Sequence, residues 1–292
     1  MSEKISEKTY NKLLSDQQDE ITAHYLYHKI ADFVKDKENK EIIRQVAEDE
    51  LKHYNQLKEI TGKELKPERF KIFLFYWITK IFGITFGIKL LERSETEAIA
   101  SYQEKTEKDI EGLEEIVCDE ERHEVELINM INEERLNYMG SVVLGLNDAL
   151  VELTGALAGY TFAFQNTRLI ALTGLITGIS ASFSMAASEY LAKKHEEGQD
   201  AVKSSIYTGI AYVFTVVFLI LPFLLIDNPF VSLISTLAVA VLIIFLFNYY
   251  ISVAKDYNFK KRFGEMAAIS LGVAGISFLI GVLIKQFIGV DI

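Results

Sequence analysis

One stretch decides the fold: Gly145-Leu146-Asn147-Asp148-Ala149-Leu150-Val151-Glu152-Leu153-Thr154-Gly155-Ala156-Leu157-Ala158-Gly159. It lies inside an apolar run, 142–164, that is long enough to cross a bilayer as a helix at about 1.5 Å per residue. Asp148 and Glu152 are four residues apart and therefore share one helical face. Because a charged side chain at the bilayer centre costs roughly 3 kcal/mol on insertion scales, we predict that both acids belong to an ion or proton path.

The composition of the chain changes near residue 137. Residues 1–137 hold 31 of the 41 acidic and 21 of the 30 basic side chains, whereas residues 138–292 are nearly neutral and very apolar. We therefore expect a water-facing part followed by a membrane part. The acidic part would repel phosphates, which argues against nucleic acid and favours metal cations as partners.

Cysteine content and the N-terminus limit the function further. With one cysteine, Cys118, the chain can form neither an intrachain disulfide nor a Cys-x-x-Cys motif. The N-terminus, Met-Ser-Glu-Lys-Ile-Ser-Glu-Lys, lacks the apolar core of a signal peptide, so we expect the first part to be cytoplasmic. Neither haem nor nucleotide is expected as a cofactor.

Residues 1–137 are predicted to form a helical bundle. Residues 6–62 read as two long helices with a polar break at 35–39, and two more helices are predicted at 92–108 and 113–136. Short turns between four helices are typical of a bundle.

The predicted bundle carries two Glu-x-x-His motifs, Glu50-Leu51-Lys52-His53 and Glu120-Glu121-Arg122-His123. Each motif places a carboxylate and an imidazole on one helical face, and each of the other two helices offers a glutamate at a matching height, Glu20 or Glu97. Four carboxylates and two imidazoles suit two iron or manganese ions. A single Glu-x-x-His motif more often lies on a solvated helix face. Two copies, each with a glutamate at the same height on another helix, favour a metal site.

Two further side chains, those of His24 and Cys118, lie near the predicted metal ligands in the sequence. His24 lies one turn beyond Glu20 and is either a spare ligand or a surface residue, and we favour the surface. Cys118 is interpreted as a small buried apolar residue rather than as a ligand.

The pattern Glu20, Glu50-x-x-His53, Glu97 and Glu120-x-x-His123 resembles the ferritin-like di-iron domain of the rubrerythrins over about residues 6–136. The resemblance implies that Tyr27 and Tyr102 lie beside the site. Ser94 stands where that family usually has a further glutamate, which implies that the second metal is bound or exchanged differently. The rubredoxin module with its cysteine pairs is absent from the sequence, so peroxide reduction through that relay is not expected.

The apolar segment 70–91 is long enough to be mistaken for a membrane span. It carries Lys71, Lys80 and Lys89, and a crossing here would put Glu20, Glu50 and His53 on the opposite side of the membrane from the other predicted ligands. We interpret the segment as interfacial, with its aromatic rings in the headgroup layer. The alternative is a dimer contact between water-facing parts.

Five later runs are apolar enough to span a membrane: 142–164, 169–191, 206–226, 230–253 and 266–284. If the first part is cytoplasmic, the inner loops carry seven Lys and Arg residues and the outer side carries Arg168 and Lys285. This arrangement obeys the positive-inside rule and places the C-terminus on the side opposite the first part.

The second run brings Met185 and Glu189 four residues apart in a helix rich in glycine and serine. Methionine is usually a gap filler, and small residues usually serve helix packing. Beside carboxylates, however, a thioether is a plausible soft ligand for a ferrous-type ion.

These two runs resemble the vacuolar iron transporter family through Asn147-Asp148-Ala149 and Ser184-Met185-Ala186-Ala187-Ser188-Glu189-Tyr190, and the likeness covers residues 138–292. It implies a five-helix homodimer that exports Fe(II) or Mn(II) in exchange for protons. Asp148 and Met185 would line the path, with Glu152 and Glu189 as relays. The loop 192–205 is short where several family members have a metal-collecting domain, and the N-terminal bundle looks like its substitute. Such fusions are known as membrane-bound ferritins.

Three functions are therefore compared. The first is a proton-coupled Fe(II) or Mn(II) exporter whose bundle collects, oxidises or senses the metal. The second is a membrane-anchored di-iron ferroxidase or peroxide-consuming enzyme, and the third is a metal sensor or buffer. Asp148 and Glu152 favour the first, because a mere anchor gains nothing from acids at membrane depth.

Overall fold

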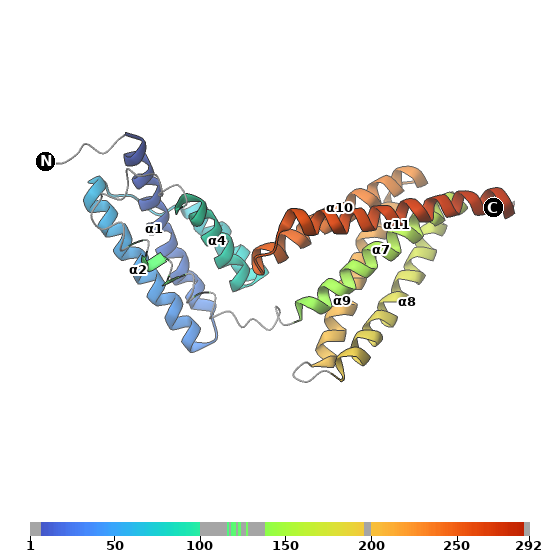
Figure 1. The fold of residues 1–292 in the computed structure, drawn as a ribbon, viewed down its shortest axis with the longest axis horizontal. Helices are drawn as coiled ribbons and strands as arrows, with labels where there is room; N and C mark the ends of the chain where they lie inside the picture. The colour runs from blue at the N-terminus through green and yellow to red at the C-terminus, as the bar shows by residue number, and fades with distance from the viewer. Residues whose placement is uncertain are drawn as a thin grey trace. The chain divides into compact units, whose positions relative to one another are not determined.

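The computed structural model describes residues 7–99, 116, 118–120, 122–123, 127, 138–195 and 200–288, with backbone alone at 92–99, 284–285 and 288. All regular secondary structure within these residues is helical, which confirms the predicted all-α class (Figure 1). The chain divides into two compact units, Met1–Glu133 and Glu134–Ile292. Each unit is described by itself below.

The first unit is built on two antiparallel helices, α1 (Glu7–Phe33) and α2 (Lys37–Thr61). The Tyr10 hydroxyl donates to the Thr61 carbonyl at 2.9 Å, and the His24 ring nitrogen Nδ1 lies 2.6 Å from the Ala47 carbonyl oxygen, so the two helices run in opposite directions. The polar break predicted at 35–39 contains the start of α2, where the Asp36 side chain accepts the Asn39 amide at 2.9 Å. Gly62, at φ 66°, ends α2 as a left-handed cap.

The apolar segment 70–91 forms two elements, α3 (Arg69–Phe82) and the start of α4 (Ile84–Ile99). Gly83 separates them at φ 106°, a conformation that favours glycine. The predicted start of the third helix at residue 92 is therefore wrong by eight residues, because the apolar run continues into α4. Ile72 and Ile88 are buried in a core cluster that also contains α1 and α2 residues. At 14 residues, α3 is shorter than the roughly 20 residues that a membrane crossing requires.

The described residues of the predicted fourth helix, 113–136, are helical. Leu127 belongs to the same core cluster as Ile72 and Ile88, and Ile116 packs with Leu13 and Leu57 in a smaller cluster. This segment therefore packs against α1 and α2, which brings the second Glu-x-x-His motif to the first.

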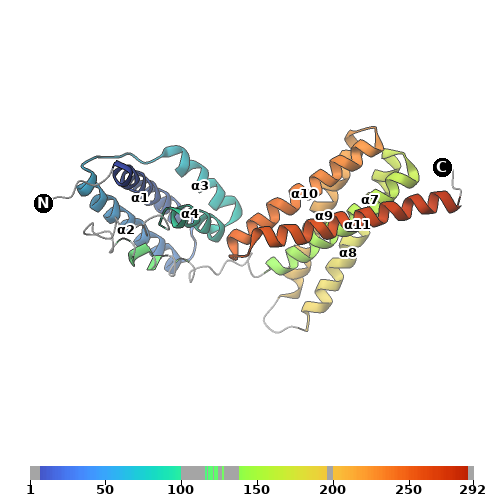
Figure 2. The same cartoon turned by 45° about the horizontal axis from the view of Figure 1, so that its top comes forward.

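The second unit contains the helices α7 (Met139–Phe164), α8 (Thr167–Lys193), α9 (Ala201–Leu225), α10 (Pro229–Ala254) and α11 (Phe259–Ile288), which Figures 1 and 2 show as a bundle. Among the described residues, five helices are long and apolar enough to cross a membrane. They coincide with the five predicted runs. Side chains of Asn166, Asp200 and Asn228 cap the starts of three of them by accepting backbone amides.

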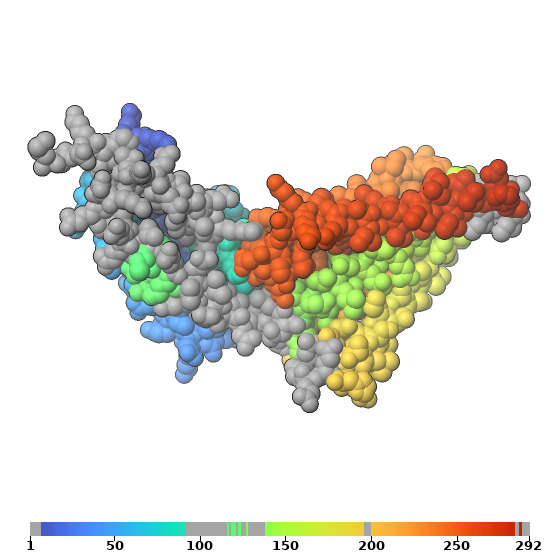
Figure 3. Space-filling model, in the orientation of Figure 1, coloured from blue at the N-terminus to red at the C-terminus, as the bar shows by residue number. Residues whose placement is uncertain are grey.

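Helix α7 is the central element of the second unit. Its buried residues Ala149, Leu150 and Leu157 share a core cluster with Tyr212 and Leu219 of α9. Figure 3 shows α11 lying along α7 on one face of the molecule. Many large apolar side chains on α8, α9, α10 and α11 are exposed, as expected for helices that face lipid.

Candidate functional site

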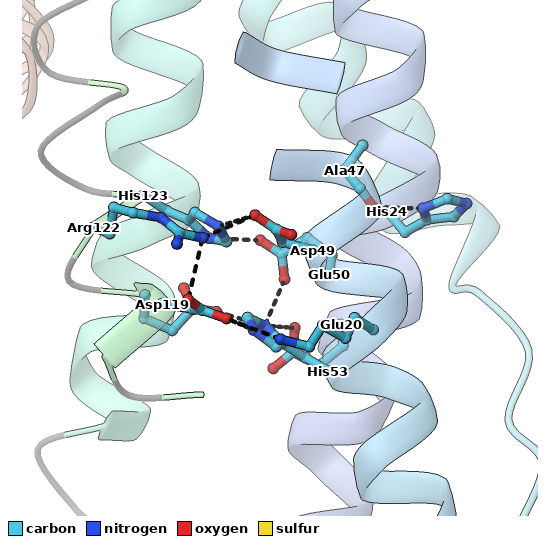
Figure 4. A network of polar contacts seen from close by, with 11 residues as sticks. Glu20, His24, Ala47, Asp49, Glu50, His53, Asp119, Arg122 and His123 are labelled. Atoms are coloured by element: carbon cyan, nitrogen blue, oxygen red, sulfur yellow. Dashed lines mark hydrogen bonds and ion pairs between the residues drawn. The ribbon is translucent and has the colours of Figure 1, made fainter. Parts of the chain in front are cut away.

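A cluster of four ligand-type side chains lies inside the first unit: Glu20, Glu50, His53 and Glu120. Each contributes one atom, and these atoms lie within 4.8 Å of one another. Glu20 comes from α1, and Glu50 and His53 come from α2 (Figure 4). Glu120 comes from the segment 118–120. Three carboxylates and an imidazole form a donor set that suits a divalent iron-type or manganese-type ion.

The imidazole of His53 faces this cluster through its Nδ1 atom. Nδ1 lies 3.1 Å from Glu120 Oε1, 3.7 Å from Glu20 Oε2 and 3.9 Å from Glu50 Oε2. His123 points its own Nδ1 toward the other side of Glu50, at 3.8 Å from Oε1. Glu50 therefore lies between the two imidazoles, with one carboxylate oxygen facing each.

Three buried atoms at the cluster have no hydrogen-bond partner among the described residues: His53 Nδ1, His123 Nδ1 and Glu120 Oε1. An unpaired polar atom in a protein interior is unfavourable unless something satisfies it. All three are of ligand type, and His53 Nδ1 and Glu120 Oε1 belong to the four-residue cluster, so the residues present fit a metal ion.

Two aspartates hold the outer nitrogens of the histidines in a crossed arrangement (Figure 4). Asp119 Oδ2 lies 3.3 Å from Nε2 of His53, and Asp49 Oδ2 lies 3.0 Å from Nε2 of His123. Arg122 donates to both aspartates, at 3.0 Å and 3.1 Å. A carboxylate on Nε2 holds one ring proton there, so Nδ1 is the nitrogen that a metal ion would bind after displacing the other proton.

Sequence reasoning missed both aspartates. The signal was present, since each one directly precedes the glutamate of a Glu-x-x-His motif. What could not be predicted is that each aspartate serves the histidine of the other motif, because that depends on how the two helices pack.

The electrostatics of the cluster favour a bound cation. Burial, followed by the charge of Glu20, raises the pKa of Glu50 well above its ordinary value. Burial also raises the pKa of Glu20 and of Glu120. Burial alone would lower the pKa of His53, but the close carboxylates of Glu120, Glu20 and Glu50 raise it above its ordinary value. Without metal, the site thus retains protons that a divalent cation would displace.

The other residues predicted for this site have different outcomes. Glu97 lies on α4, where only the backbone is described, and Tyr102 lies outside the described residues. Tyr27 is buried in the core of the unit. His24 binds the Ala47 carbonyl and is absent from the four-residue cluster. Cys118 is exposed, so the interpretation of a buried residue was wrong, because the side chain faces away from the core that Ile116 joins.

In the second unit, two acids of the spans are held by neighbouring helices. The Tyr212 hydroxyl of α9 donates to Glu152 Oε2 of α7 at 2.6 Å. Glu189 of α8 is buried and accepts the Ser141 hydroxyl of α7 at 2.6 Å. Asp148 lies on α7 between these two points and is half-buried.

Helix α9 supplies a row of polar side chains that sequence reasoning also missed. Ser204, Thr208 and Tyr212 recur every four residues and are fully buried. Thr208 donates to the Ser141 carbonyl of α7 at 3.0 Å, and Tyr212 binds Glu152. The spacing of four was a readable signal for a polar face on α9, and Thr208 and Tyr212 of this face bond to α7.

The polar contacts that hold Glu189 and Glu152 lie at two different heights on α7. Ser141 and Glu152 are eleven residues apart, so the polar contacts extend over about 16 Å of α7, roughly half the hydrocarbon thickness of a bilayer. Met185 of α8 packs against the core of the second unit. The polar contacts are therefore spread along α7, with Asp148 between them.

Comparison with known proteins identifies part of the chain. Residues 139–199, which include α7 and α8, match the model of the VIT family. A comparison with curated proteins gave no match. Together with the five candidate spans, the family match supports a membrane domain that transports metal ions.

Proposed function

We propose that the protein exports Fe(II) or Mn(II) from the cytosol in exchange for protons, and that the bundle collects the ion. The observation that carries this proposal is the set of acids within the spans that match the VIT family, Asp148, Glu152 and Glu189. Carboxylates inside the membrane can bind a hard cation and can also carry protons in the return direction.

The positions of these acids support a path. Glu189 and Glu152 are each held by a hydroxyl from a neighbouring helix, and Asp148 lies between them on α7 without a hydrogen bond from the described residues. A carboxylate that no protein group satisfies is the one best suited to take a passing ion. We therefore assign Asp148 as the principal ion-binding residue, with Met185 as a soft neighbour.

The bundle cluster supports a collecting role. Glu20, Glu50, His53 and Glu120 would hold the cation that is later transported, and raised carboxyl pKa values would make its uptake depend on pH. The distribution of Lys and Arg favours a cytoplasmic bundle with the C-terminus on the far side of the membrane. The resemblance to the transporter family extends the proposal to a homodimer.

A second candidate is supported by the same cluster. The shared position of Glu50 between two imidazoles is suited to a two-metal centre, so a ferroxidase or peroxide-consuming activity in the bundle is the alternative. Asp148 distinguishes the two functions, because an anchored oxidase does not need it.

Reconstituted liposomes test the proposal directly. The full chain should move Fe(II) or Mn(II) with a counterflow of protons, measured with a metal-sensitive dye and a pH dye. Asp148→Asn should lower the flux by about tenfold or more, the effect of roughly 1.4 kcal/mol on the limiting step. Asp227→Asn, at an exposed site between α9 and α10, is the matched control and should transport normally. Full transport by the Asp148 variant would refute the path, and an absence of flux with intact iron oxidation would favour the enzyme.

A further inference from the structure

Helix α3 has two different faces. Its inner face packs on the bundle through Ile72, which is buried, and through Phe75 and Tyr76, which contact the same core. Figure 2 shows α3 running beside α1, and Lys71 is joined to Asp19 of α1 at 2.7 Å. The helix is thus a fixed part of the first unit.

The outer face of α3 is apolar and exposed. Phe70 is 77% exposed, Phe73 61% and Trp77 42%, and Leu74 and Ile81 are exposed as well. The positions 70, 73, 74, 77 and 81 follow the helical repeat, so these side chains form one stripe. A contiguous apolar stripe on a water-facing unit indicates an interaction surface.

The charge of α3 differs from that of the unit to which it belongs. Residues 1–137 are strongly acidic, yet the sequence of α3, Arg-Phe-Lys-Ile-Phe-Leu-Phe-Tyr-Trp-Ile-Thr-Lys-Ile-Phe, holds three cations and no acid. Lys71 is engaged by Asp19, which leaves Arg69 and Lys80 exposed at the two ends of the stripe. The Lys80 ammonium lies 5.0 Å from the centre of the Trp77 ring and 5.4 Å from that of Tyr76.

We propose that α3 binds the surface of a bilayer that contains anionic lipids, with its apolar stripe inserted among the headgroups. The chain brings such a surface within reach, because residues 134–138 are all that separate the first unit from the first span, α7. Aromatic side chains flanked by Lys and Arg are the composition that favours the interface between lipid and water. The exposed cations of α3 complement the phosphates of anionic lipids.

The experiment uses Trp77, which is the single tryptophan of the chain and lies on the stripe. The full chain is reconstituted in liposomes of phosphatidylcholine and phosphatidylglycerol, with and without lipids brominated on the acyl chain close to the headgroup. Brominated lipid should lower Trp77 emission about twofold, since an interfacial helix buries its apolar face roughly 5–10 Å into the boundary layer. Aqueous acrylamide should quench it weakly.

Two variants show whether the stripe and its charge are responsible. Phe73→Ser removes an exposed ring, and Lys80→Gln removes an exposed charge, so neither disturbs the core. Both should reduce quenching by brominated lipid and increase quenching by acrylamide, as should removal of phosphatidylglycerol. Tyr25→Ser, at an exposed aromatic residue on α1, is the matched control and should change neither. Circular dichroism verifies that each variant is folded.

Two results would overturn the proposal. Strong acrylamide quenching without any effect of brominated lipid would place the stripe in water. Protection from both quenchers would place it against protein, as in a contact between two copies of the first unit.

Discussion

At the scale of single residues, the ligand cluster depends on two aspartates, Asp119 and Asp49, which contact the outer nitrogens of the two histidines. Asp119 accepts from the outer nitrogen of His53, and Asp49 does the same for His123. Each imidazole is therefore oriented by a residue of the opposite motif. Because one ring proton is held on the outer nitrogen, Nδ1 is the nitrogen that faces the carboxylates of the cluster.

Asp119→Asn tests this orienting role. The amide keeps the shape but replaces a charged acceptor, so we expect the affinity for Mn(II) or Co(II) to fall by roughly 10–100-fold, the usual effect of removing such a partner. Metal titration of the purified full chain by calorimetry measures the change. Glu48→Gln, which alters the exposed partner of His28, is the control. Equal affinity in the Asp119 and Glu48 variants would show that His53 needs no carboxylate on Nε2.

The hydrogen bond from Tyr212 to Glu152 gives a second prediction at this scale. Tyr212→Phe removes only the hydroxyl that donates to Glu152, and a hydrogen bond to a charged group contributes roughly 1.5–3 kcal/mol. We expect metal flux in liposomes to change at least several-fold and its pH profile to shift, because Glu152 then lacks its donor. Tyr207→Phe on the same helix, where the ring stacks on Tyr138, should leave both unchanged. A normal pH profile in the Tyr212 variant would remove Glu152 from the proton route.

At the scale of elements, α7 and α9 meet at Gly145. A β-carbon at this position would lie 2.3 Å from the carbonyl oxygen of Thr208, so the helix backbones approach as closely as glycine allows. This close approach also lets the Thr208 hydroxyl reach the Ser141 carbonyl. Gly145 therefore serves the close packing of α7 against α9.

Gly145→Ala should therefore destabilise the membrane unit. The added methyl group would push α9 away from α7, and overpacking of this kind typically costs about 1–3 kcal/mol. Thermal unfolding followed by circular dichroism in detergent should show a lower midpoint. Gly140→Ala is the matched control, because a β-carbon there would meet nothing within 4 Å. If both variants melt like the parent chain, the close approach of α7 and α9 does not contribute to stability.

Element boundaries show what the sequence could and could not predict. The five spans were predicted because long apolar runs have few structural solutions, and the structure agrees within a few residues at most ends. The start of α4 was missed because the aromatic segment gives no periodic signal that separates Phe82 from Ile84, and only the backbone shows the break at Gly83. Tyr212 and the two aspartates were missed because their roles arise from packing between helices.

At the scale of the whole molecule, the acidic charge of the chain is concentrated in the unit that carries the cluster. The raised pKa values of Glu20, Glu50 and Glu120 mean that, above pH 4.5, the folded metal-free chain binds more protons than the unfolded chain. The pKa of His53 in the folded chain lies above its ordinary value of 6.5. Its protonation therefore stabilises the folded chain fully below pH 6.5, and this stabilisation is lost as the pH rises above that value. The pKa of Asp119 is lowered by its contacts with His53 and Arg122 despite the opposing effect of burial, and its contribution is lost only under acid conditions.

The metal-free bundle should therefore become less stable as the pH rises from about 5 to about 8. Thermal unfolding of the chelator-treated full chain across this range measures the effect. Adding Mn(II) at roughly 100 times its Kd should restore about 2.7 kcal/mol and flatten the dependence. Glu50→Gln combined with Glu120→Gln should also flatten it without metal. A metal-free chain that gains stability toward pH 8 would contradict the assigned directions.

The crossed aspartates have a consequence for the order of assembly. Helices α1 and α2 alone contain Glu20, Glu50 and His53, but the carboxylate that orients His53 comes from residue 119, and the one that orients His123 comes from residue 49. Neither half of the bundle holds a finished set of ligands. Metal binding would therefore require that the segment carrying Asp119 and His123 is already packed against α2. Binding of the metal and completion of the fold would then occur together.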